Sequence, residues 1–253
     1  MDRKKYEFTG ETRALSSTTI LHRIRAVIDI PSAGVNAGDI GGWIESDSNL
    51  SHDYDAWVGG DAWVSGNAWV VSDARVSGNA CVGGDAWVDG NAWVGGNARV
   101  GGNAWVGSNA WVGGNARVGS NARVDGNACV GGDAWVYGNA RVDGNARVSG
   151  NARVRGDARV DGDAQVDGNA RVGGDAHINS DEDFIVIGPI GSRNGFTTFY
   201  KNKDENVCVR CGCFSGTVDE FLAAVQKTHG DNRFGQEYRI AAELAKAHIL
   251  EED

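Results

Sequence analysis

The chain has 253 residues, with 34 acidic and 24 basic side chains and a formal net charge of −10. This acidity argues against a general nucleic-acid binder, so we expect no direct binding to nucleic acid. No apolar run approaches the roughly 20 residues that cross a bilayer, and the first residues lack the apolar core of a signal peptide, so no membrane partner is expected. Five cysteines without a disulfide-like framework favour a reducing compartment, which predicts a cytoplasmic protein.

Residues 1–52 are of mixed composition and contain one clear strand signal. In residues 19–30, "TILHRIRAVIDI", apolar side chains alternate with charged ones, as in a half-buried strand. Residues 36–51, "NAGDIGGWIESDSNLS", are interpreted as turns that lead into the next segment. We expect 1–52 to form an N-terminal β cap, because an open end of a repetitive β structure exposes both core and backbone.

Residues 53–178 consist of 21 consecutive hexads without an insertion. Valine recurs every sixth residue from Val58 to Val172, Ile178 closes the series, and an alanine stands two residues before each of them. A period of six spreads valine around a helix, whereas in a strand residues two apart point to the same side. Ala-x-Val therefore predicts a short strand with Ala and Val inward, and the x-Gly-Asn/Asp that follows predicts a corner.

The hexads "VGGNAW" (100–105) and "VDGNAR" (142–147) resemble the hexapeptide-repeat proteins, which fold as left-handed parallel β-helices. The resemblance implies three hexads per turn and hence about seven triangular coils, roughly 30 Å long at the spacing of neighbouring strands. It also implies a homotrimer. The segments "KYEFTGE", "DIGGWIE", "GPIGSRN" and "CGCFSGT" around the hexads look like those of phage and prophage proteins, which implies a phage protein in the cytoplasm of a bacterial host cell.

The outward residue between Ala and Val is Trp in eight hexads and Arg in nine. With three hexads per turn, residues 18 apart stack on one face of the helix, and one face separates early Trp from late Arg. We predict this face as an interaction face, formed by Trp69, Trp87, Trp105, Arg123, Arg141 and Arg159. Large exposed Trp patches mark partner surfaces, but they also suit self-association and cation–π pairing within the rod.

The six-residue period ends at Ile178, and the sequence of residues 179–253 predicts a small α+β module. Residues 183–190 indicate a buried strand, and 196–212 indicate a hairpin around the polar turn "NKDEN". A helix is predicted from Gly216 to His229, with Thr217 and Glu220 at capping-box spacing, and a second amphipathic helix over 235–252.

Two groups in this module are candidate sites. If the glycine-rich loop after Gly188 faces the segment before the first helix, their side chains could hold a phosphate or carboxylate, with plain turn chemistry as the alternative. That candidate set is Ser192, Arg193, Asn194, Thr197, Ser215 and Thr217. Cys208, Cys211 and Cys213 with His229 suggest zinc, but the Cys-x2-Cys-x-Cys spacing is imperfect and buried, inert thiols are the preferred interpretation. No metal or other cofactor is expected.

Many hexapeptide-repeat proteins are acyltransferases, which resemble one another in a histidine base near a subunit boundary. Here the repeats hold one histidine, His177, at their end, and His52 precedes them. A base also needs a pocket and an orienting partner. We therefore expect a non-enzymatic phage-type binding protein: a rigid trimer that interferes with host defence machinery by sequestering a small anionic, nucleotide-like ligand or by occluding a host protein. An acyltransferase and a structural spacer are the alternatives.

Overall fold

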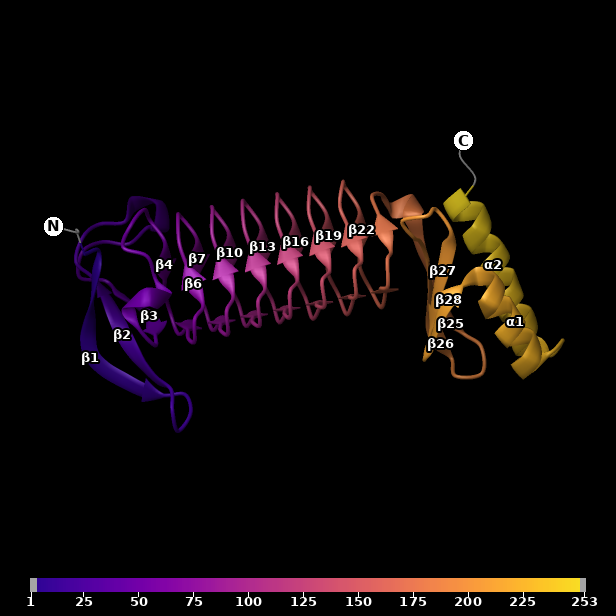
Figure 1. Ribbon diagram of the computed structural model, residues 1–253, viewed down its shortest axis with the longest axis horizontal. Coiled ribbons are helices and arrows are strands. Elements are labelled where there is room, and N and C mark those ends of the chain that lie inside the picture. Colours follow the sequence, from indigo (N-terminus) through magenta and orange to yellow (C-terminus); the bar gives the residue numbers. More distant parts are fainter. Residues whose placement is uncertain (1–3, 251–253) are drawn as a thin grey trace.

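The computed structural model describes residues 4–250 as one elongated molecule (Figure 1). A row of parallel β coils forms the middle, an antiparallel β hairpin lies at the N-terminal end, and a sheet backed by two helices closes the C-terminal end. The sequence-based prediction of a mainly β protein with a parallel β-helix between two caps is confirmed.

Each hexad contributes one two-residue strand, and residues 18 apart pair in parallel, as in Trp93 with Trp111. The strands build three faces, named here A, B and C. Face A contains β5 (Trp63–Val64), β8 (Cys81–Val82), β11 (Arg99–Val100), β14 (Arg117–Val118), β17 (Trp135–Val136), β20 (Arg153–Val154) and β23 (Arg171–Val172). Face B contains β4 (Trp57–Val58), β7 (Arg75–Val76), β10 (Trp93–Val94), β13 (Trp111–Val112), β16 (Cys129–Val130), β19 (Arg147–Val148) and β22 (Gln165–Val166). Face C contains β6 (Trp69–Val70), β9 (Trp87–Val88), β12 (Trp105–Val106), β15 (Arg123–Val124), β18 (Arg141–Val142), β21 (Arg159–Val160) and β24 (His177–Ile178).

The core of the solenoid is built from the repeated Ala and Val side chains. From Ala56 to Ile178, every inward Ala, Val or Ile of the hexads is at most 2% exposed. A fully buried valine contributes roughly 1.5–3 kcal/mol of hydrophobic free energy. The alternating pattern therefore accounts for the continuous core along the rod.

Hydrogen bonds join each coil to the next. The amides of Trp93, Gly95 and Asn97 donate to the carbonyls of residues 110, 112 and 114, at 2.9, 2.9 and 2.7 Å, and most other hexads repeat this pattern. The corner asparagines also form side-chain ladders between the coils. In three of these ladders each side-chain amide donates to the next asparagine, and the last asparagine donates to an aspartate. These ladders are Asn79–Asn97–Asn115–Asp133, Asn91–Asn109–Asn127–Asn145–Asp163 and Asn103–Asn121–Asn139–Asp157. A carboxylate accepts but cannot donate, so Asp ends each ladder.

The solenoid begins before the first hexad, so it has about eight turns rather than the expected seven. Strand β3 (Ile40–Ile44) pairs in parallel with β5, and Leu50 forms a bridge to Val70 on face C. The prediction of turns was therefore wrong for Ile40–Ile44. Gly41 and Gly42 serve close packing there, because a Cβ at Gly42 would lie 2.6 Å from the carbonyl oxygen of Ala62.

The N-terminal hairpin extends face A outward beyond β3. Its strands are β1 (Tyr6–Ala14) and β2 (Ile20–Ala26), and β2 pairs antiparallel with both β1 and β3. Ile24 and Ala26 are buried, as the alternation in 19–30 predicts. The hairpin thus covers the first edge of this sheet.

The C-terminal sheet consists of β25 (Phe184–Ile190), β26 (Gly195–Lys201), β27 (Val207–Cys211) and β28 (Phe214–Thr217), all antiparallel. One side covers the end of the solenoid: Tyr200 and Cys208 join the solenoid core, and the Lys203 amide donates to the Asp175 carbonyl at 3.0 Å. Helices α1 (Val218–His229) and α2 (Arg233–Leu250) pack on the other side (Figure 1). The predicted hairpin, the capping box at Thr217 and both helices are confirmed. Residues 251 and 252 of the second predicted helix lie outside the described residues.

No helix within residues 4–250 combines the length and apolar character needed to cross a membrane.

Replacing Gly114 with alanine should destabilise the solenoid. Gly114 has a φ of +63°, and a Cβ there would lie 2.9 Å from the Gly132 amide nitrogen. We expect a loss of about 1–3 kcal/mol in the free energy of unfolding, measured by urea denaturation. Gly119→Ala is the matched control, because Gly119 has an ordinary φ and the nearest atom to its Cβ would be 3.9 Å away; it should change stability by less than about 0.5 kcal/mol. Equal losses in both variants would contradict this account of the corners.

Candidate anion-binding site

Four arginines surround a cavity of about 140 Å³ where the solenoid meets the C-terminal sheet. Arg153 and Arg171 are outward residues of face A, Arg155 follows Val154 at the adjoining corner, and Arg210 comes from β27. Tyr137 completes the wall on the solenoid side. Arginines from two parts of the chain therefore converge on one small space.

The packing of the C-terminal sheet positions Arg210 over the solenoid. Thr198, which pairs with Arg210 across β26 and β27, accepts a hydrogen bond from the Arg171 amide at 2.9 Å. Gly173 provides room for the two arginines that cross above it. A Cβ at Gly173 would lie 3.1 Å from both Arg155 Cγ and Arg210 Nη2, so even alanine would press on these side chains.

The arginines of this cluster have no carboxylate partner in the described part of the chain. Among residues 4–250, none of the four forms an ion pair with Asp or Glu. The Nε of Arg210 is buried and has no hydrogen-bond acceptor within the described part of the chain. Arginine guanidinium groups match phosphate and carboxylate geometry, and a buried donor without an acceptor costs free energy. The cluster is therefore suited to an anion.

A second cavity, of about 350 Å³, adjoins this cluster and shares Arg171 and Gly212 with it. Its walls come from the loop after β25, the β27–β28 turn and both helices. Aromatic side chains predominate among its larger lining residues, and Ser192, Arg193, Thr228 and His229 add polar groups. The aromatic members are Phe196, Phe214, Phe221 and Tyr238. Such a lining suits a flat ring with polar substituents.

Contacts with α2 hold the loop that forms one wall of this aromatic cavity. The Gly191 amide donates to Glu237 Oε2 at 2.8 Å, and this bond together with Arg233 lowers the pKa of Glu237. Any side chain at Gly191 would overlap Tyr238. Burial, and next the neighbouring Cys211, raise the pKa of Tyr238 to about 12, so its hydroxyl stays protonated at neutral pH.

The structure brings together part of the anion-binding set predicted from the sequence. Ser192 and Arg193 line the aromatic cavity. Asn194 closes the turn, because its backbone amide donates to the Gly191 carbonyl at 3.0 Å. Thr197 is buried and donates to Cys211 Sγ at 3.3 Å.

The other two residues of that set lie on a strand. The expected loop before the first helix is β28, which places Ser215 opposite Arg210, on the solenoid side of the sheet. Thr217 caps α1 and accepts from the Glu220 amide. The two segments therefore do not face each other as a pair of loops.

The three cysteines of the C-terminal module are divided between two environments. Cys208 is buried against the solenoid core, and burial raises the pKa of its thiol. Cys211, Cys213 and His229 line the aromatic cavity instead. Within residues 4–250 no three His, Cys, Asp or Glu side chains are grouped so that they could hold a metal ion.

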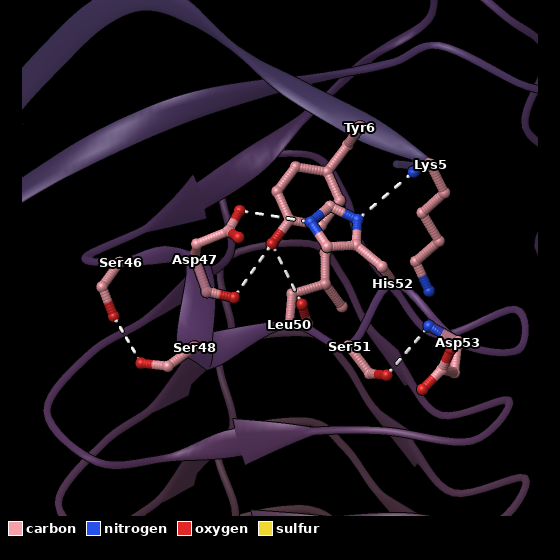
Figure 2. A network of polar contacts seen from close by, with 9 residues as sticks. All are labelled: Lys5, Tyr6, Ser46, Asp47, Ser48, Leu50, Ser51, His52 and Asp53. Atoms are coloured by element: carbon pink, nitrogen blue, oxygen red, sulfur yellow. Dashed lines mark hydrogen bonds and ion pairs between the residues drawn. The ribbon is translucent and has the colours of Figure 1, made fainter. Parts of the chain in front are cut away.

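His52 forms part of the N-terminal packing (Figure 2). Its Nδ1 accepts from the Lys5 amide at 3.2 Å, its ring stacks on Tyr6 with centroids 4.2 Å apart, and its Nε2 lies 3.2 Å from Asp47 Oδ1. Because Nδ1 accepts, Nε2 carries the proton and donates to Asp47. The Tyr6 hydroxyl lies 3.1 and 3.0 Å from the carbonyl oxygens of Asp47 and Leu50. His177, at the far end of the solenoid, lies 3.6 Å from Asp161.

The predicted interaction face is face C, and its residues stack as expected. Trp69 and Trp87 stack with ring centroids 5.6 Å apart and are 44% and 46% exposed, and Arg123 lies 3.9 Å above the Trp105 ring. Further along, Arg123 and Arg141 share a small cavity with Asp125 and Asp143. Face C therefore places opposite charges beside each other, which the arginine cluster on face A does not.

The sequence signal for the cluster lies at the position after valine. At the corner beyond face A this position reads Ser65, Gly83, Gly101, Gly119, Tyr137, Arg155 and Gly173, without an acid. At the corner beyond face C it holds Asp89, Asp125, Asp143 and Asp161. The position between Ala and Val, from which the interaction face was predicted, does not show this difference between faces A and C.

A family model described as the YdcK beta solenoid repeat matches residues 146–162, which lie in the solenoid and contain β19, β20 and β21. No curated protein matches the chain. The parallel coils show that the chain is a β-solenoid, and the short match lies within those coils.

Proposed function

We propose that the protein is a non-enzymatic binding protein that captures a small anion of nucleotide-like chemistry at the junction of the solenoid and the C-terminal sheet. The observation that carries the proposal is the arginine cluster: Arg153, Arg155, Arg171 and Arg210 converge on one cavity without a carboxylate partner among residues 4–250. The chain as a whole carries a net charge of −10, so this concentration of positive charge runs against its overall electrostatics.

The cavity beside the cluster supports a ligand that is more than a bare phosphate. Arg171 and Gly212 line both cavities, so an anionic group held by the arginines can extend a flat ring toward Phe196 and Phe214. Arg193 and Ser192 then lie near that ring as polar contacts. Charged hydrogen bonds position the anion, and aromatic surface adds affinity for the ring.

A binding role fits His52 and His177, the histidines beside and within the repeats, better than acyl transfer does. His52 is engaged by Lys5, Tyr6 and Asp47, and neither it nor His177 lines the two cavities. A general base must reach the proton that it removes, with a pocket for the substrate around it. The rigid rod also suits a spacer, but a spacer leaves the arginine cluster without a role.

The biological setting follows from the resemblance to hexapeptide-repeat and phage proteins. In this proposal the protein is phage-encoded, acts as a homotrimer in the bacterial cytoplasm, and weakens host defence by sequestering a nucleotide-like signal. Each subunit of the trimer carries its own junction site. Capture without turnover is sufficient for this role.

Removing one arginine of the cluster should weaken anion binding. A hydrogen bond to a charged group contributes about 1.5–3 kcal/mol, so Arg210→Ala should reduce the affinity for inorganic pyrophosphate and ADP about 10- to 100-fold in calorimetric titrations. Arg147→Ala on face B is the control and should bind as the wild type does, because Arg147 lies on another face. Absence of binding by the wild type, or equal losses in both variants, would refute the proposal.

A second candidate function is occlusion of a host protein by face C. The exposure of the stacked pair Trp69 and Trp87 favours it, because large exposed aromatic patches are typical of interfaces.

Replacing Trp87 with serine tests this second function. The variant should lose host proteins that the wild-type protein retains from bacterial lysate, measured by quantitative mass spectrometry, because a large aromatic contact is removed. Trp111→Ser, which changes an exposed Trp on face B, should retain them. Unchanged retention by Trp87→Ser argues against a partner surface on face C.

A further inference from the structure

Face A carries a third hollow, a groove of about 710 Å³ that runs along the solenoid toward the arginine cluster. Trp63 lies at one end and Trp135 and Tyr137 lie at the other, with Arg99 and Arg117 between them. Along the solenoid these ends are four coils apart, about 19 Å at the spacing of parallel strands. The groove therefore has room for a planar group next to the cluster.

Glycines form the floor of this groove, and the backbone does not require two of them. Gly101 and Gly119 have no left-handed φ, and a Cβ at either would approach only a backbone oxygen, at 3.8 and 3.9 Å. By contrast, Gly102 has a φ of +65° and its Cβ would collide with the next coil. The effect of Gly101 and Gly119 is to leave backbone surface open, where a flat group can lie close to the chain.

Each of the three hollows shares lining residues with the next. Tyr137 lines both the groove and the arginine cavity, and Arg171 and Gly212 line both the arginine cavity and the aromatic cavity. Positive charge thus occupies the centre, with a space for a flat group on each side. Trp135 helps to order Arg153 of the cluster, because the guanidinium group of Arg153 lies 5.1 Å from its ring centre. The guanidinium group of Arg117, in the groove, lies 4.8 Å from the same ring.

We infer that the ligand is a dinucleotide: two ring-bearing groups joined by a phosphate bridge. The bridge lies among Arg153, Arg155, Arg171 and Arg210, one base enters the aromatic cavity, and the other lies on the glycine floor beside Tyr137. This inference rests on the proposed function and adds the second base to it. A mononucleotide fills the centre and one side, and leaves the other side to water.

The aromatic cavity and the groove come from different parts of the chain, so the contribution of each to ligand binding can be tested separately. The aromatic cavity belongs to the C-terminal module, whereas the groove belongs to the solenoid alone. A substitution on the groove floor can therefore remove the second base without changing the four arginines of the cluster. Gly119→Leu does this, because the space above Gly119 is open and its φ is ordinary.

The test compares diadenosine and diguanosine diphosphate with ADP, GDP and inorganic pyrophosphate by calorimetric titration of the full chain. We expect one of the two dinucleotides to bind at least about tenfold more tightly than its mononucleotide, since base stacking contributes about 1–3 kcal/mol. Gly119→Leu should abolish this gain and leave the affinity for pyrophosphate unchanged. Ser149→Leu, at the equivalent position after Val148 beyond face B, should keep the gain.

The remaining outcomes separate the two claims. If pyrophosphate and mononucleotides bind but neither dinucleotide binds more tightly, the dinucleotide inference is wrong and the proposed anion site stands. If none of the probes binds, both are wrong. If Gly119→Leu, but not Ser149→Leu, changes the oligomeric mass in native mass spectrometry, the groove is an interface between copies of the chain, and the dinucleotide inference is overturned.

Discussion

The 18-residue register between coils is the constraint on which the molecule depends. Each hexad directs backbone amides to the carbonyls of the hexad 18 residues later, and the corner asparagines repeat the same step with their side chains. Because these bonds and the buried Ala and Val satisfy the backbone and the core, the outward residues are released from a structural role. Trp, Arg, Cys, Gln and His can therefore occupy equivalent positions without a change of fold.

A register of this kind leaves two unpaired ends, and the ways in which they are closed differ. At the N-terminal end β3 and Leu50 continue the coil, and the hairpin of β1 and β2 extends one sheet. At the C-terminal end the antiparallel sheet lies across the opening, with Tyr200 and Cys208 in the core. Covering an edge protects it from association with other chains. Here the covering sheet also delivers Arg210 to face A, so closure and the candidate site arise from the same packing.

Much of the fold could be predicted from the sequence, because the hexad assigns one physical role to each position. Turns were expected in 36–51 because adjacent glycines such as Gly41 and Gly42 are common in turns. In the structure these two glycines lie in a strand, where neighbouring atoms leave no room for a side chain. The candidate site was harder to predict, since Arg155 and Arg210 are 55 residues apart in the sequence and meet only through the docking of the C-terminal sheet. Ser192 and Arg193 were placed near a cavity, whereas the strand alternation of β28 directed Ser215 away from it.

The meeting of Arg210 with face A limits how the gene can change in length. Gain or loss of 18 residues within the hexads adds or removes one whole coil and returns each later strand to its own face. Gain or loss of a single hexad shifts every later strand by one face, so the C-terminal sheet then meets the solenoid turned by one side of the triangle. Recombination between the near-identical hexads yields both kinds of product. Selection for the junction would retain the lengths that differ by three hexads, and rods of different length would then carry the same site.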